Sequence, residues 1–340
     1  MRTFFNFKET NYNPDKYLDL IKEEIKDYKF NTFNLGISIP SEKTIDEKED
    51  IKLNFQKQLT SLIEEKLNIK KRNEYGDVNI VVDFNYNRID YNITPVYVYG
   101  IYNKLQRNLP QTIDYCFKCK GKGCKLCDYK GVINKTSIQE KINSYFKEIF
   151  KNEDNKFHGS GREDKDVLML GNGREFVLEL INPKLREISL EELNKLLDKI
   201  NLEEKDVLQI SNLSFCEKSK IKEIKEAKHF KSYRAIVSCE EKIIQDKLNT
   251  LEKNKIIEII QKNPKRMKKS RANIERKRTC EIINYNIINE NEFELELKAE
   301  AGLYVKEFIS GDNELTKPSI SEIIENKCIC KQLDVIYIHR

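Results

Sequence analysis

Four cysteines occur at regular spacing within one short segment of this chain. The segment CFKCKGKGCKLC places Cys116, Cys119, Cys124 and Cys127 as two Cys-x-x-Cys pairs. Two residues between thiolates let a tight turn aim both sulfurs at one metal ion, and two such turns complete a tetrahedral ligand set. The pattern therefore predicts a zinc knuckle at residues 116–127. A redox pair is the alternative, but redox motifs come singly.

A catalytic zinc would need other ligands. Catalytic sites keep one position open and usually employ histidine, and base deaminases add a His-x-Glu motif. The chain has three histidines, His158, His229 and His339, and no His-x-Glu. We therefore expect a closed, structural zinc site.

Length and composition favour two domains. The chain has 340 residues, of which 39% are hydrophobic, enough for ordinary cores. Its start, MRTFFNFKETNYN, lacks the apolar core of a signal peptide, and no run of about 18 apolar residues occurs. We expect a cytoplasmic monomer without a membrane-spanning segment.

Hydrophobic periodicity divides the chain near residue 155. Charged helical patterns and alternating strand patterns indicate an α+β domain at residues 1–154 that contains the knuckle. The polar segment 151–157 is the best candidate for a linker. We expect helices at 14–28, 42–67 and 137–150, and strands at 77–84 and 88–100.

Strand patterns outnumber helices after this boundary. Capping-box patterns predict helices that begin after Ser189 and Ser319. The second domain, residues 155–340, is therefore expected to be α+β with a broad, largely antiparallel sheet. We expect its strands at 174–181, 205–215, 233–239, 277–288, 292–301, 303–309 and 333–338.

The charge of the chain is most one-sided in the segment KNPKRMKKSRANIERKR, residues 262–278. Glu275 is its single acid. Such a block predicts binding of a polyanion, most simply the phosphates of RNA or DNA, and a basic loop without a ligand is the alternative. The chain lacks a phosphate-binding Gly-x-x-x-x-Gly-Lys-[Ser/Thr] loop and a dinucleotide fingerprint, so we do not expect ATP or NAD chemistry. The basic residues are Lys262, Lys265, Arg266, Lys268, Lys269, Arg271, Arg276, Lys277 and Arg278.

Residues 158–173, HGSGREDKDVLMLGNG, hold four of the twelve glycines of the chain. Glycine permits left-handed turns and close approaches, so this segment is expected to be a shaped loop that presents acid groups. A solvated acidic turn is one alternative. A glycosidase that uses two of Glu163, Asp164 and Asp166 is another, but it would leave the basic block unexplained.

The segment FHGSGREDKDVLMLGNGREFVLEL resembles the catalytic segment of the archaeal and eukaryotic tRNA pseudouridine synthases that modify uridines 54 and 55 of the TΨC loop. Further matches follow the same order: TPVYVYGIYNKLQRNLPQT, the knuckle, KSYRAIV, the basic block, AGLYVKEFISGDNELTKPSISEII and LDVIYI. The resemblance spans about residues 77–340. It implies a pseudouridine synthase catalytic domain after a THUMP-like RNA-binding domain. It also implies a reaction without an organic cofactor, because the same base is reattached through carbon.

The resemblance also implies roles for single residues. Asp164 would attack the target nucleotide, at uracil C6 or at ribose C1′. Tyr233 would stack on the base and help to remove the C5 proton, Lys306 would pair with the aspartate, and Val305 would pack beneath the base. A zinc-bearing RNA-binding protein without catalysis is the alternative. Besides the basic block, Arg162, Arg174 and Arg234 are expected to contact the RNA.

Overall fold

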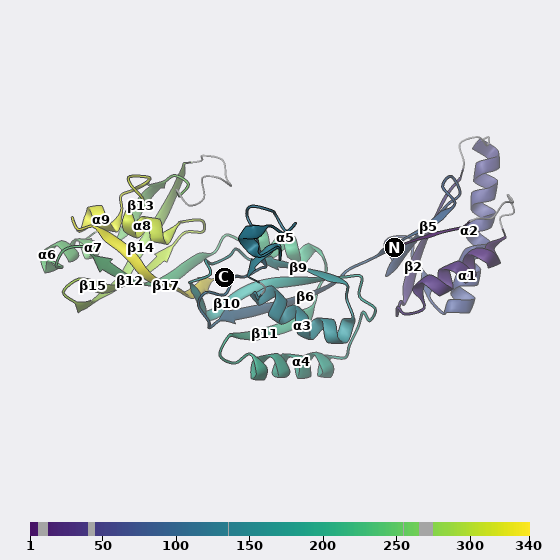
Figure 1. Ribbon diagram of the computed structural model, residues 1–340, viewed down its shortest axis with the longest axis horizontal. Coiled ribbons are helices and arrows are strands. Elements are labelled where there is room, and N and C mark those ends of the chain that lie inside the picture. The colour runs from purple at the N-terminus through teal and green to yellow at the C-terminus, as the bar shows by residue number, and fades with distance from the viewer. Residues whose placement is uncertain (6–12, 40–44, 135, 254, 265–274) are drawn as a thin grey trace. The chain divides into compact units, whose positions relative to one another are not determined.

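The computed structural model describes residues 1–5, 13–39, 45–134, 136–253, 255–264 and 275–340 (Figure 1). The chain forms two compact units, each discontinuous in sequence. The first comprises Met1–Val98, Ile142–Phe157 and Leu178–Leu193, and the second comprises Tyr99–Lys141, His158–Val177 and Asn194–Arg340. The cysteine knuckle, expected in the N-terminal domain, lies in the second unit. The boundary near residue 155 and the THUMP-like assignment stay predictions.

The first unit is built on a five-stranded sheet with two helices, α1 (Pro14–Ile25) and α2 (Ile45–Leu67). Both helices bury apolar side chains, such as Ile21 and Leu59, in one core with alternate residues of the sheet, such as Ile80. That alternation is the period of a strand with one buried face. In sheet order the strands are β1 (Arg2–Phe4), β5 (Arg88–Ile93), β4 (Val78–Asp83), β2 (Thr32–Ser38) and β3 (Lys70–Lys71).

The strand expected at 88–100 is two strands. It is interrupted at Thr94 and Pro95, and β6 (Val96–Lys104) follows. Proline has no N–H to donate to a sheet, so a continuous strand at this position is disfavoured. The break lets β5 pair in the five-stranded sheet while β6 enters the larger one.

A ten-stranded sheet supports the second unit. Strand β12 pairs antiparallel with both neighbours, β15 and β17, and the β14 pairings with β13 and β15 are also antiparallel, whereas β10 runs parallel to β17. The expected α+β class with a broad, largely antiparallel sheet is confirmed. In sheet order the strands are β11 (Leu208–Phe215), β6, β10 (Leu168–Ile181), β17 (Cys328–His339), β12 (Phe230–Cys239), β15 (Glu292–Ala299), β14 (Arg276–Asn289), β13 (Ile256–Gln261) and β16 (Thr316–Lys317), with β9 (Asp154–Gly159) on β10.

Two local expectations were wrong. The segment 151–157, expected to be a linker, leads into β9. The segment 303–309, expected to be a strand, contains helix α8 (Val305–Ser310). Its buried Val305, Phe308 and Ile309 follow helical spacing, and Gly311 ends the helix with a left-handed φ of 79°.

The sequence predicted some of the remaining helices and missed others. The expected helices α3 (Ile138–Phe150), α4 (Leu190–Glu203) and α9 (Ile320–Ile323) are present, and the side chains of Ser189 and Ser319 cap the last two. Sequence patterns missed α5 (Ser219–Glu226), α6 (Gln245–Leu248) and α7 (Thr250–Lys253). Within the described part of the chain, no helix is long and apolar enough to cross a membrane.

Candidate active site

The loop between β9 and β10 turns sharply at its glycines. Gly161 has a left-handed φ of 81°, and its N–H donates a hydrogen bond to the carbonyl of Gly159 over 2.9 Å. A Cβ atom at Gly161 would lie 3.1 Å from the Arg174 guanidinium. Glycine is thus required here both by the backbone angle and by the approach to Arg174.

Glu163 anchors this loop to the interior. Its side chain is 1% exposed and accepts a hydrogen bond of 2.8 Å from Nε of Arg174, whose Nη1 donates to the Ser160 carbonyl. The Tyr102 hydroxyl donates to the same carboxylate and accepts from Gln111. Burial by itself lowers the pKa of Arg174, but the charge of Glu163 outweighs it and the net shift is upward. The guanidinium therefore stays charged and fixed.

A buried lysine holds the next turn of the loop. Lys104, at the end of β6, is fully buried, and its ammonium donates to the backbone carbonyls of Leu109, Asp164 and Lys165 at 3.0–3.1 Å. Burial lowers the pKa of Lys104, and the nearby carboxylate of Glu163 opposes this. Three carbonyl acceptors occupy all three donors of an ammonium group. These hydrogen bonds hold the backbone around Asp164 in place.

The Asp164 side chain is partly exposed. Lys306, from the first turn of α8, lies 3.4 Å from one of its carboxylate oxygens. The same ammonium donates to both carboxylate oxygens of Asp166, at 2.7 and 2.8 Å. Burial acts to raise the pKa of Asp166, but its bonds to Lys306 prevail and lower it. Lys306 therefore forms ion pairs with two carboxylates at once.

One pocket of about 460 Å³ brings together the four residues predicted to be catalytic. Asp164 comes from the loop, Val305 and Lys306 from α8, and Tyr233 from the middle of β12. Its volume falls in the range of small-molecule sites. Residues from three distant segments thus line one space of small-molecule size.

Two side chains of β12 that line this pocket have shifted pKa values. Burial raises the pKa of Tyr233 to about 12, so its phenol is protonated at neutral pH. Lys231, two residues earlier on the same face of the strand, also lines the pocket. Burial, with a contribution from Arg174, lowers the pKa of Lys231 to about 8. The site thus contains a neutral phenol and an ammonium close to its titration point.

The residues expected to contact RNA differ in their positions relative to the pocket. Arg162 and Arg276 line the pocket. Arg174 also reaches it, but it is nearly fully buried against Glu163. Arg234 points to the other face of β12 and pairs with Glu296, which lies directly opposite on β15. Lys265, Arg266, Lys268, Lys269 and Arg271 lie outside the described residues.

Sequence patterns missed Tyr102, Lys104 and Lys231 as parts of this site. Tyr102 and Lys104 lie in β6, inside a segment singled out only by its resemblance to a family. Lys231 could have been found, because the Lys-x-Tyr spacing places it beside Tyr233 on one face of a strand. No local pattern indicates that Lys104 is buried.

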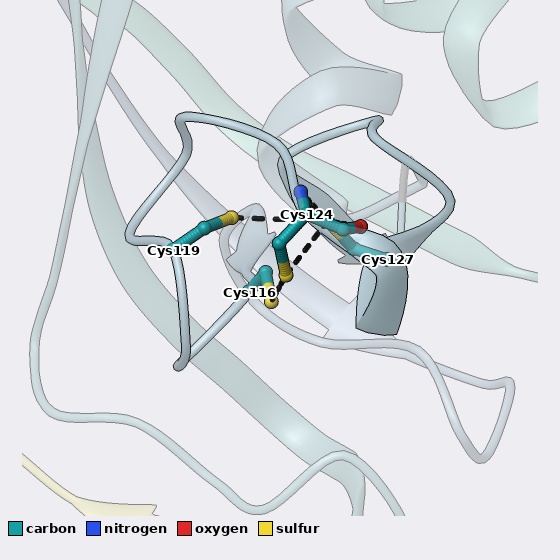
Figure 2. Close-up of side chains that lie close together, drawn as sticks. All are labelled: Cys116, Cys119, Cys124 and Cys127. Atoms are coloured by element: carbon teal, nitrogen blue, oxygen red, sulfur yellow. Dashed lines mark hydrogen bonds between the residues drawn. The ribbon is translucent and has the colours of Figure 1, made fainter.

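The cysteine knuckle lies in the same compact unit. The sulfurs of Cys116, Cys119, Cys124 and Cys127 converge within 4.8 Å of one another (Figure 2). The N–H of Gly123 donates to Cys119 Sγ at 3.1 Å, and the N–H groups of Cys124 and Gly131 donate to Cys127 Sγ.

The donor set of the knuckle suits a metal ion. Burial acts to raise the pKa of the Cys127 thiol, but hydrogen bonds from backbone N–H groups and from neighbouring thiols lower it to about 7. Burial, with hydrogen bonds to neighbouring thiols, raises the pKa of the Cys119 thiol to about 11. Four convergent sulfurs supported by backbone donors can hold a metal ion with a preference for thiolates.

Comparison with known proteins agrees with this geometry. The family model described as "Pus10, C-terminal" matches residues 97–339. The tRNA pseudouridine synthase Pus10 of Methanocaldococcus jannaschii is 40% identical over 333 residues, which cover 96% of this chain and 72% of that protein. That of Methanosphaera stadtmanae is 35% identical, with coverage of 96% and 86%. That of Archaeoglobus fulgidus is 34% identical, with coverage of 95% and 91%. The chain therefore belongs to the Pus10 family of tRNA pseudouridine synthases.

Proposed function

We propose that this enzyme converts uridines 54 and 55 of the tRNA TΨC loop to pseudouridine, with Asp164 as the nucleophile. The observation that carries the proposal is the pocket in which Asp164, Tyr233 and Lys306 meet. The ammonium of Lys306 lies 3.4 Å from the carboxylate of Asp164 and places a positive charge beside the proposed nucleophile. The resemblance to the family supplies the role of the aspartate and the two uridine positions.

The reaction is an isomerisation that needs no other reactant. Asp164 adds to the nucleotide at uracil C6 or at ribose C1′, and the N1–C1′ bond breaks. After the base turns, C5 bonds to C1′, the C5 proton leaves, N1 gains a proton in place of its bond to the ribose, and the aspartate is released. Because the target atoms are hidden in a stacked loop, the base must first swing out into the pocket.

Tyr233 takes part as a stacking surface. Its phenol is protonated at neutral pH because burial raises its pKa to about 12. A protonated phenol is a poor base for the C5 proton, but its ring can cover an apolar base face. Val305 lines the same pocket, and the two side chains provide apolar contact for the uracil.

Pocket cations provide the contacts with phosphate. Arg162, Lys231 and Arg276 line the same space as Asp164. An extruded nucleotide brings its phosphates to the rim of such a pocket, where cations stabilise them. The basic block extends this charge along the chain.

The four knuckle cysteines would hold a structural zinc ion. The convergence of their sulfurs supports a closed tetrahedral site. Such a site contributes folding free energy, since four thiolates gathered without a metal repel one another. No catalytic step passes through it.

A single assay tests the proposal against an RNA-binding protein without catalysis. Purified protein is incubated with an unmodified tRNA transcript, and pseudouridine is mapped with a chemical label specific for it. Label at positions 54 and 55 is the expected result. Label at other uridines would overturn the assigned positions, and binding of the transcript without any label would favour the non-catalytic alternative.

A further inference from the structure

We propose that the knuckle surface, the exposed aromatic and lysine side chains of residues 114–134, contacts unpaired nucleotides of the RNA substrate. This inference rests on the proposed function and adds to it a second contact with the substrate. The surface stands outside the catalytic pocket, and the cysteines act only as its frame.

Three aromatic rings are unusually exposed there. Phe117 is 79% exposed, Tyr129 71% and Tyr115 60%. Single exposed apolar residues need no explanation, but several large ones on one small module indicate a binding surface. Aromatic rings of this kind stack on unpaired bases, because every base offers a flat π-face.

The charge around these rings favours RNA over a protein partner. The segment carries five exposed lysines and only two acids, Asp114 and Asp128. Lys130 lies 3.4 Å from Asp128, and no other ion pair is found for the knuckle lysines among the described residues. A basic surface interleaved with aromatic rings matches the phosphates and bases of a single strand. The lysines are Lys118, Lys120, Lys122, Lys125 and Lys130.

The backbone of the knuckle keeps these side chains outside. The side chains of Cys116 and Cys119 point toward the other two cysteines (Figure 2). Phe117 and Lys118 lie between these two cysteines in sequence, and both are exposed. Strands β7 (Asp114–Tyr115) and β8 (Val132–Asn134) close the module at its base. The rings are therefore presented on a preorganised frame, which lowers the entropy lost on binding.

A cavity beside the loop of Asp164 reaches the first residue of the knuckle segment, Asp114. It has a volume of about 350 Å³, and its lining includes residues 110–114, Arg162, Asp164 and Lys306. All of these residues belong to one compact unit. We expect an RNA strand with one nucleotide at Asp164 to pass residues 110–114, which continue in sequence into the knuckle. The knuckle would then hold nucleotides that flank the target.

The test compares two paired substitutions. The variant Phe117→Ala with Tyr129→Ala removes two rings, and the variant Leu190→Ala with Leu202→Ala removes two side chains of similar exposure, 71% and 75%, from α4. Equilibrium binding of an unmodified tRNA transcript is measured together with zinc content. We expect about tenfold or greater loss of affinity in the aromatic variant, with zinc retained and little change in the α4 variant.

Two further variants separate stacking from other effects. Phe117→Tyr with Tyr129→Phe keeps both rings and should bind like the wild type. Lys118→Glu with Lys122→Glu keeps the rings, and should weaken binding and flatten its dependence on salt. These changes lie on exposed side chains, so they also test the surface if the alanine variant folds poorly.

The outcomes distinguish this inference from the proposed function. Wild-type affinity in both the aromatic and lysine variants would overturn the knuckle contact and leave a protein partner as the explanation of the exposed rings. Equal losses in the aromatic and α4 variants would also overturn it. If the wild-type enzyme binds tRNA through the knuckle but forms no pseudouridine, the proposed function fails and the contact stands.

Discussion

The ammonium of Lys306 lies closer to Asp166, at 2.7 Å, than to Asp164, at 3.4 Å. The lysine expected to serve the nucleophile is thus held mainly by its neighbour two residues along the loop. Asp166 is more exposed than Asp164. This arrangement lets Asp166 fix the position of Lys306, while Asp164 lines the pocket.

The two aspartates should respond differently to the same substitution. Asp164→Asn retains shape but removes the nucleophilic charge, so turnover should fall by at least about a thousandfold with little change in tRNA affinity. Asp166→Asn should cost only about tenfold, because Lys306 remains beside Asp164. Single-turnover pseudouridine formation checks both. Comparable losses in the two variants would contradict the assignment and favour a pair of catalytic carboxylates.

The buried pair of Glu163 and Arg174 should be strongly coupled. Glu163→Gln leaves a buried guanidinium without its counter-ion and should lower the free energy of unfolding by about 3–5 kcal/mol. The double variant Glu163→Leu with Arg174→Met removes both charges of the pair and should lose less than the single variants Glu163→Leu and Arg174→Met together. Urea unfolding measures this cycle. Additive losses would show that the pair does not act as a unit.

Binding of tRNA should depend on pH through Lys231. Its pKa of about 8 makes the side chain cationic below pH 8 and neutral above it. If Lys231 contacts phosphate, wild-type affinity should fall by about tenfold between pH 7 and pH 9. Lys231→Arg stays charged and should not show this fall, whereas Lys231→Met should bind weakly throughout. An identical pH profile in wild type and Lys231→Met would exclude the contact.

The basic block should contribute to the salt dependence of binding. Reversing Lys268, Lys269 and Arg271 to Glu should reduce the slope of log affinity against log salt by about two to three. The reason is that the RNA keeps its counterions at each phosphate that the protein no longer contacts. The control reverses Lys222, Lys242 and Lys327, which pair with glutamates elsewhere. A slope unchanged by the block variant, or changed equally by the control, would exclude this role.

The knuckle should bind one zinc ion per chain. Replacing Cys116, Cys119, Cys124 and Cys127 by Ser should abolish zinc retention, and removal of zinc by a chelator should lower the melting temperature. Elemental analysis and thermal unfolding provide the two readouts. Zinc retained after all four replacements would place the metal elsewhere in the protein.

The sequence alone was sufficient where the determining contacts are local. The four cysteines fall within twelve residues, so their spacing predicts their convergence. The capped helices after Ser189 and Ser319 and the alternation in β12 and β15 are also short-range patterns, and the structure confirms them. The acids of the glycine-rich loop could be identified for the same reason, although their separate roles could not.

The support of the glycine-rich loop depends on contacts between segments that are distant in sequence. Lys306 donates hydrogen bonds to Asp166, which lies 140 residues away in the chain. Lys306 belongs to helix α8, where the sequence pattern predicted a strand. Lys104 reaches the Asp164 carbonyl across 60 residues, and its complete burial contradicts the usual preference of lysine for solvent. Such contacts depend on which strands become neighbours in the sheet, and that order results from packing over the whole unit rather than from the period of any one segment.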